Sequence, residues 1–92
     1  MKLDIVSPEG ILFSGEVNSV VVPGVNGAFE ILNNHAPIIA ILGKGEIRIK
    51  GDKILIDNEV QDKFKVTTGE AVLPIHSGTV EMKNNKVIVL AE

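Results

Sequence analysis

Residues 20–27 read Val20-Val21-Val22-Pro23-Gly24-Val25-Asn26-Gly27. The valines are β-branched and suit a pleated, half-buried surface. The proline then fixes φ, and the two glycines permit the positive φ values of a tight reversal. The stretch therefore predicts a β-strand, a turn and a second strand. It cannot be a phosphate-binding loop, because neither a Lys-Ser/Thr pair nor a helix start follows it.

The same alternation of strands and turns continues outward along the chain. Val and Ile make up about a quarter of the 92 residues, and Ala is scarce. Apolar and charged residues alternate with period 2 at residues 46–50, 63–66 and 80–83, which is typical of strands with one buried face. Turn-forming residues, among them Asn84-Asn85, separate these runs at short intervals. We therefore expect an all-β fold, a small β-sandwich or flattened barrel of about ten short, mostly antiparallel strands.

Four runs are apolar on both faces of the expected strand: residues 20–22, 38–42, 54–56 and 87–90. Such a strand is either central in a sheet or presents its outer face to a partner. A single domain of 92 residues cannot bury all four runs from both sides. The sequence therefore predicts one domain, residues 1–92, that docks onto other proteins.

Composition excludes several other classes of protein. The formal net charge is -3, and the chain has three Phe, no Trp and no Tyr, whereas a nucleic-acid binder carries a basic stripe and stacking aromatics. No segment approaches the ~18 apolar residues of a membrane span. The N-terminus lacks the apolar core of a signal peptide. We expect a soluble, unexported chain that binds no nucleic acid and does not insert into a membrane.

No catalytic constellation or cofactor site is visible. His35 and His76 lack metal-binding spacing, and with no cysteine a zinc site would need both histidines plus carboxylates. We interpret His35 as a loop imidazole bonded to backbone groups. Two alternatives stay open at this stage. One is a ligand-binding sandwich, for example for carbohydrate, although without Trp or Tyr it offers little stacking area. The other is a small hydrolase that uses one of the histidines.

Three ordered blocks, residues 13–17, 22–27 and 31–39, read FSGEV, VPGVNG and ILNNHAPII. Together they resemble the epsilon subunit of F-type ATP synthases, with its P-G-x-x-G and H-A-P motifs, and residues 3–9 and 77–92 resemble its two ends. The resemblance implies a non-catalytic central-stalk subunit that docks on the gamma subunit and the c ring. There it would couple ion-driven rotation to ATP synthesis, on the cytoplasmic side of the bacterial plasma membrane and without a cofactor.

The chain departs from the family pattern at several positions. Glu30 and Thr79 replace common glycines, and Asn33 replaces a proline. Ala28 stands where the family often has an acidic residue, so a charged ring contact is not implied. Residues 51–73 look like a hairpin insertion. The chain ends at Glu92, without the inhibitory helical hairpin of typical bacterial members. We therefore expect either a sandwich-only member or part of a longer protein, and no self-inhibition through the residues given.

The resemblance also implies a partner interface. We expect it at a rim formed by the Pro-Gly turn and the H-A-P segment, where motif residues and apolar side chains concentrate. The eleven predicted interface residues are Val25, Asn26, Gly27, Ala28, Phe29, Asn34, His35, Ala36, Pro37, Ile38 and Ile39.

Overall fold

Ten β-strands and one turn of 3-10 helix make up the chain in a computed structural model, which describes residues 1–92. The elements are β1 (Lys2–Ser7), β2 (Gly10–Glu16), β3 (Ser19–Gly24), β4 (Gly27–Leu32), β5 (Ile38–Leu42), β6 (Gly45–Lys50), η1 (Gln61–Lys63), β7 (Lys65–Thr67), β8 (Glu70–Ile75), β9 (Gly78–Lys83) and β10 (Lys86–Ala91). Every strand pair is antiparallel except β1 with β10. The expected all-β, mostly antiparallel fold is confirmed.

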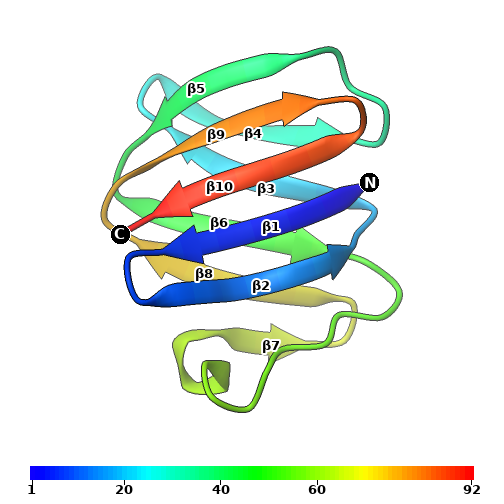
Figure 1. The fold of residues 1–92 in the computed structure, drawn as a ribbon, viewed down its shortest axis with the longest axis vertical. Helices are drawn as coiled ribbons and strands as arrows, with labels where there is room; N and C mark the ends of the chain where they lie inside the picture. Colours follow the sequence, from blue (N-terminus) through cyan, green and yellow to red (C-terminus); the bar gives the residue numbers. More distant parts are fainter.

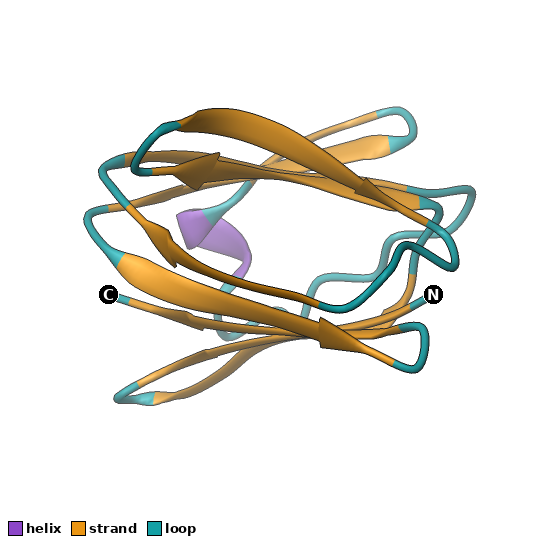
Figure 2. Cartoon of the chain, turned by 90° about the horizontal axis from the view of Figure 1, so that it is seen from above, coloured by secondary structure: helices purple, strands orange, loops and turns teal.

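The strands form one continuous sheet that folds into two layers (Figures 1 and 2). Its order is β2-β1-β10-β9-β5-β3-β6-β8-β7, with β4 on the free side of β3. The sheet turns between β5 and β3, which share only the pair Gly24 and Leu42. We call β2-β1-β10-β9-β5 the front layer and β4-β3-β6-β8-β7 the back layer, as they lie in Figure 1.

The core lies between the layers and follows from the period of two. On most strands, alternate apolar residues point inward and are largely shielded from solvent, whereas the short strand β7 has no buried residue. The fully buried positions include Leu3, Ile5, Val80, Val87 and Val89 in the front layer and Val20, Val22, Ile31, Ile47 and Ile49 in the back layer. Every buried side-chain polar atom has a hydrogen-bond partner.

Turn chemistry accounts for the tight hairpins. The reversal predicted at residues 20–27 joins β3 to β4, and Gly27 has a φ of 124° that favours glycine. Asn84 and Asn85 join β9 to β10 with φ values of 53° and 59°. Two consecutive residues with positive φ define a type I′ turn, whose twist matches that of the flanking strands. Asparagine tolerates this conformation better than most residues do.

The connection between β6 and β8 differs from expectation. Residues 54–56 form no strand. Ile54 and Ile56 instead pack against the core, while Leu55 between them is 82% exposed. The segment faces β2 on one side and leads into β7 and β8 on the other, so it covers the edge of the sandwich opposite the β5–β3 join. Residues 54–56 are apolar because Ile54 and Ile56 cover this edge of the core, although the segment pairs with no strand.

The sequence predicted a strand with one buried face at residues 63–66, and the structure confirms this only in part. Phe64 is buried, but Val66 is 47% exposed in the short edge strand β7. An edge strand of three residues has no neighbour on its free side to cover that position. Residues 70–73, the end of the expected insertion, belong to β8 and pair with residues 47–50 of β6. That residues 51–73 are an insertion relative to the family stays a prediction.

Candidate docking surface

The eleven predicted interface residues lie near both ends of β5. Val25 and Asn26 form the tip of the β3–β4 hairpin, beside the end of β5 at Leu42. Residues 34–37 form the β4–β5 loop, which precedes the other end of β5 (Figure 1). The two segments are therefore joined by β5 rather than gathered on one rim.

The structure brings six of the eleven together. Val25, Asn26, Gly27, Ala28, Phe29 and Ile39 line an open groove of about 550 Å³ between the hairpin and β5, with Gly24, Ala40 and Ile41 completing its wall. We call this the hairpin groove. Asn34, His35, Ala36 and Pro37 lie outside it. Ile38 is half-buried and packs against the core, so it offers less surface to a partner than Ile39, which is 81% exposed.

The sequence-based interface omits a line of side chains across the outer surface of the front layer, here called the front face. Strand pairing places Ile41 opposite Thr79, Thr79 opposite Leu90, and Leu90 opposite Val6. Val6 in turn lies opposite Ile11. Paired residues project from the same side of a sheet, so these side chains form one line across five strands. We call Ile41, Leu90, Val6 and Ile11 the aliphatic row.

The aliphatic row is largely open to solvent. Ile11 is 66%, Ile41 65% and Leu90 54% exposed, and Ile39 projects from the same face. A second open groove, also of about 550 Å³, follows Val6, Ile41 and Leu90. Exposed hydrophobic residues gathered in this way mark interaction sites. The front face is therefore a candidate docking surface, and the prediction that part of the apolar surface stays unburied is confirmed.

The sequence indicated exposed apolar surface for only two of the four residues in the aliphatic row. Ile41 and Leu90 belong to runs that are apolar on both faces. Ile11 gave no such signal, because a β-bulge between β1 and β2 decides which way it points. The register shifts so that Ile5 opposes Phe13 while Val6 opposes Ile11, which leaves Leu12 as the extra residue. Leu12 packs against the core, and Ile11 then faces outward.

The front face changes from apolar to charged along its strands. At the end away from the aliphatic row, Lys83 pairs with Lys86 and Lys86 with Lys2, so three lysines cross β9, β10 and β1. Asp4 lies one position further in, with its Oδ2 3.9 Å from Lys86 Nζ. The hydroxyl of Ser14 donates a 2.7 Å hydrogen bond to Asp4 Oδ1. The row of lysines is therefore separated from the aliphatic row by positions that include Asp4 and Glu81, which lie opposite Ile88 on the neighbouring strands.

The outer surface of the back layer is of a different kind. Arg48 of β6 is ion-paired to Glu46 at 3.0 Å and to Glu70 of β8 at 3.3 Å. Lys50 lies 3.4 Å from Glu30 of β4. Charged side chains that pair with one another across exposed strands are typical of a face that stays in water. The two faces of the sandwich thus differ in their apolar residues: both carry ion pairs, but the aliphatic row lies on the front face.

Glu30 is held by its neighbours on the back face. The Ser19 hydroxyl donates a 2.8 Å hydrogen bond to Glu30 Oε2, and the Lys50 ammonium lies beside the same oxygen. The Ser19 hydrogen bond first, and then Lys50, hold the pKa of Glu30 below its ordinary value. Both contacts favour the ionised carboxylate. They explain how a glutamate is accommodated where the family often has glycine.

We expect Glu30→Gln to lower stability slightly at pH 7 and to have no effect in acid. Because the folded-state pKa is depressed, the stabilisation is present above the unfolded-state value of about 4.3. It is lost as the pH falls through the folded-state pKa, where wild type also becomes neutral. Urea denaturation of both proteins from pH 7 downward measures the difference. The control is Glu81→Gln, at an exposed glutamate outside the ion pairs. A Glu30 effect that persists in acid would contradict the assignment.

Neither histidine has the surroundings of a catalytic group. His35 Nδ1 lies 2.7 Å from the carbonyl oxygen of its neighbour Ala36, in agreement with a loop imidazole bonded to backbone. His76 lies beyond the opposite end of the β5–β9 pair. No group of three metal-ligating side chains occurs. Phe13 and Phe64 are buried and Phe29 is half-buried, so no aromatic platform supports the carbohydrate alternative.

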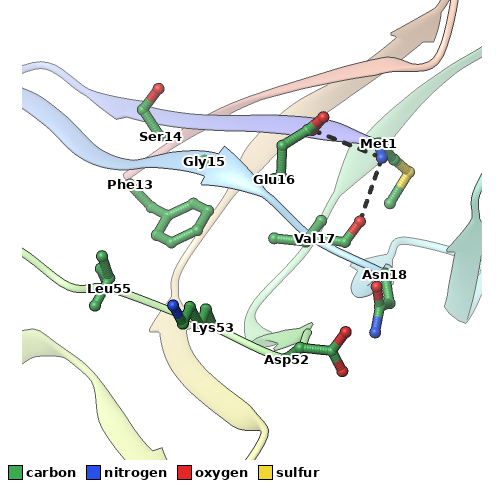
Figure 3. A pocket seen from close by; sticks show the side chains of 10 residues that line it. All are labelled: Met1, Phe13, Ser14, Gly15, Glu16, Val17, Asn18, Asp52, Lys53 and Leu55. Carbon is green, nitrogen blue, oxygen red and sulfur yellow. Dashed lines mark hydrogen bonds and ion pairs between the residues drawn. The ribbon is translucent and has the colours of Figure 1, made fainter.

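A pocket of about 440 Å³ lies between β2 and residues 52–55 (Figure 3). The Met1 ammonium donates a 3.3 Å hydrogen bond to the Val17 carbonyl and lies 3.7 Å from Glu16 Oε2. Phe13 and Leu55 form part of its apolar lining. The Met1 ammonium is paired within the chain, and no histidine lines the pocket. The pocket therefore does not suggest catalysis.

These features define a class of protein: a small β-sandwich with one exposed aliphatic face, which is a candidate docking surface. The family model of the ATP synthase, Delta/Epsilon chain, beta-sandwich domain matches residues 1–92. The chain therefore belongs to the ATP synthase epsilon chain family. It is a non-catalytic subunit of ATP synthase, peripheral to the membrane.

Individual relatives agree with this assignment. The ATP synthase epsilon chain of Chlorobaculum tepidum is 38% identical over 98% of this chain and 86% of its own length. That of Leptospira interrogans is 40% identical over 100% of this chain, which spans 61% of the relative's length. The fold matches a chain in the central stalk and c-ring structure of Tetrahymena thermophila mitochondrial ATP synthase with a TM-score of 0.74 and 13% identity. That match covers 99% of this chain and 62% of the other.

Proposed function

We propose that this chain is a central-stalk component of a bacterial ATP synthase that binds the gamma subunit through its front face. The hairpin groove would rest against the c ring. In this position the domain couples ion-driven rotation of the ring to ATP synthesis on other subunits, on the cytoplasmic side of the plasma membrane. The single observation that carries the proposal is the exposed aliphatic row on the front face.

The front face also indicates the chemistry of its partner. The aliphatic row supplies the apolar area that a stable interface needs near its centre. The three lysines at the other end of the same strands favour acidic groups on the facing surface. We therefore expect a gamma surface with an aliphatic stripe that is flanked on one side by Asp or Glu.

The hairpin groove suits an uncharged contact. Val25 is 60% exposed at its tip, and Ala28 and Phe29 lie on its wall. Ala28 occupies the position where the family often has an acidic residue, so the contact with the ring would depend on packing rather than on an ion pair. Such a contact is weakly sensitive to salt.

The fold is suited to transmitting force. Of the 57 backbone hydrogen bonds, 44 lie within the regular elements, all ten strands belong to one sheet, and the core between its layers is shielded from solvent. Close-packed interiors have low compressibility. The single helical element, η1, has three residues, and no helix of the structure is long and apolar enough to cross a membrane. The proposed position is accordingly beside the membrane, on other subunits.

The direct test mixes the purified chain with the gamma subunit of its own complex. We expect a one-to-one complex on size exclusion and a negative heat-capacity change in calorimetry, because apolar surface is buried. A gamma variant without its acidic flank should bind more weakly, with a smaller salt dependence. No complex at concentrations of tens of micromolar would contradict the proposed function.

A further inference from the structure

Asn85 connects two turns that are far apart in the sequence. Its Oδ1 accepts a 2.7 Å hydrogen bond from the backbone N–H of Asn34, and its Nδ2 donates a 3.0 Å hydrogen bond to Asn33 Oδ1. A backbone N–H requires an oxygen acceptor, so the first bond fixes the orientation of the amide and directs its NH₂ group toward Asn33. The β9–β10 turn thus holds the β4–β5 loop at two adjacent residues.

The loop is built in a way that needs such support. The His35 N–H donates to the Leu32 carbonyl at 3.1 Å and closes a β-turn with Asn33 and Asn34 at its centre. Only Asn34 has positive φ, 63°, the pattern of a type II turn. Proline is favoured at the first central position of this turn because it presets φ. Asn33 supplies no such restraint.

The backbone of Asn85 is itself held firmly. The type I′ turn fixes the φ of Asn85, and the backbone carbonyl of Asn85 accepts a 3.1 Å hydrogen bond from the N–H of Lys2 in β1. Asn85 is thus fixed by both β10 and β1, in the middle of the front layer. Asn84 shares the turn and the positive φ, but its side chain makes no hydrogen bond to the loop.

We propose that Asn85 is a positioning residue that sets the β4–β5 loop, including His35, in its docking conformation relative to the front face. The inference rests on the proposed function, because the loop belongs to the predicted interface. Asn85 acts through the loop and does not itself contact gamma. It replaces, by hydrogen bonding from another turn, the rigidity that a proline at residue 33 would provide.

The test compares Asn85→Gly with the matched control Asn84→Gly. Glycine accepts positive φ at both positions, and Asn-Gly is favoured in type I′ turns, so both variants keep the hairpin and the Lys2 bond. We expect amide exchange of Asn34 and His35 to become about tenfold faster in Asn85→Gly, the value of one to two ordinary hydrogen bonds. Binding to gamma should weaken about three- to tenfold for the same reason. Asn84→Gly should change neither.

A rescue variant separates positioning from direct contact. Asn33→Pro is compatible with the turn, because the N–H of Asn33 donates to no backbone acceptor and Leu32 is in an extended strand. In the double variant Asn33→Pro/Asn85→Gly, we expect slow His35 exchange and gamma affinity to return. Asn34 exchange should stay fast, since its acceptor is still missing. Recovery of affinity without Asn85 would support a positioning role.

Three outcomes would overturn the inference. The first is unchanged exchange in Asn85→Gly. The second is faster exchange with unchanged affinity, which would show that the loop does not take part in docking. The third is rescue of exchange without rescue of affinity, which would make Asn85 a contact residue. Failure of the proposed function is distinguishable from all three, because the wild-type chain would then form no complex with gamma.

Discussion

Leu90→Asp should weaken binding of the chain to the gamma subunit roughly thirty- to a thousandfold. Leu90 lies in the middle of the aliphatic row, between Thr79 and Val6 on the neighbouring strands. Docking would remove the new carboxylate from water without giving it a partner, and truncated or charged hot-spot residues commonly cost ~2–4 kcal/mol of binding free energy. Leu90 is 54% exposed in the free chain, so the folded monomer tolerates the change. Calorimetric titration with gamma measures the affinity, and a thermal melt checks the fold.

Leu55→Asp is the matched control. Leu55 is the same residue type and is 82% exposed, but it lies on the segment that closes the far edge of the sandwich. We expect it to bind gamma with an affinity within about twofold of wild type, as surface changes outside an interface do. If Leu90→Asp were folded and bound normally, the front face would not be the interface. If Leu55→Asp weakened binding instead, the interface would lie on residues 51–64.

Gly78→Ala should destabilise the fold by about 3 kcal/mol, the upper part of the usual range for overpacking. Gly78 begins β9, with Leu42 of β5 on one side and Ala91 of β10 on the other. An added Cβ would overlap the backbone carbonyl oxygen of Leu90. A backbone atom in the centre of the front layer cannot move aside as a flexible side chain can. For a domain of this size the melting temperature should fall by roughly 10–20 °C.

Gly43→Ala is the control for this change. The nearest atom to a Cβ at Gly43 is Val25 Cγ1 at 3.6 Å, an ordinary contact. We expect an effect within about 1 kcal/mol, and glycine-to-alanine changes without strain can even stabilise. Urea denaturation gives both values. Equal stability of the two variants would show that β9 and β10 separate enough to admit a side chain at residue 78.

Much of the fold followed from local chemistry. The valine run before Pro23 predicted β3, the glycines predicted the hairpin to β4, and paired asparagines predicted the turn at residues 84–85. These features work within a few residues, so no knowledge of the rest of the chain is needed. Residues 54–56 were misassigned for the converse reason. An apolar run is compatible with a strand or with a segment that packs without pairing, and only its neighbours distinguish the two.

The candidate site depended more on long-range pairing. The predicted interface combined the hairpin tip and the β4–β5 loop because both carry family motifs, yet they lie near opposite ends of β5. Six of the eleven residues share the hairpin groove. The contact between Asn85 and the loop joins residues 51 and 52 positions apart. Residue order alone offers no signal for such a contact.

The sequence by itself determined the class of fold, the surplus of apolar strand surface and the family motifs. Each depends on residue type and local spacing. The tertiary structure alone decided where that surplus surface is exposed. Residues from β5, β10, β1 and β2 form the aliphatic row, because β9 lies between β5 and β10 and because β1 pairs in parallel with β10 at the other end of the chain. Alternation within a strand cannot specify its neighbours, and the bulge at Leu12 reverses the side on which Ile11 emerges.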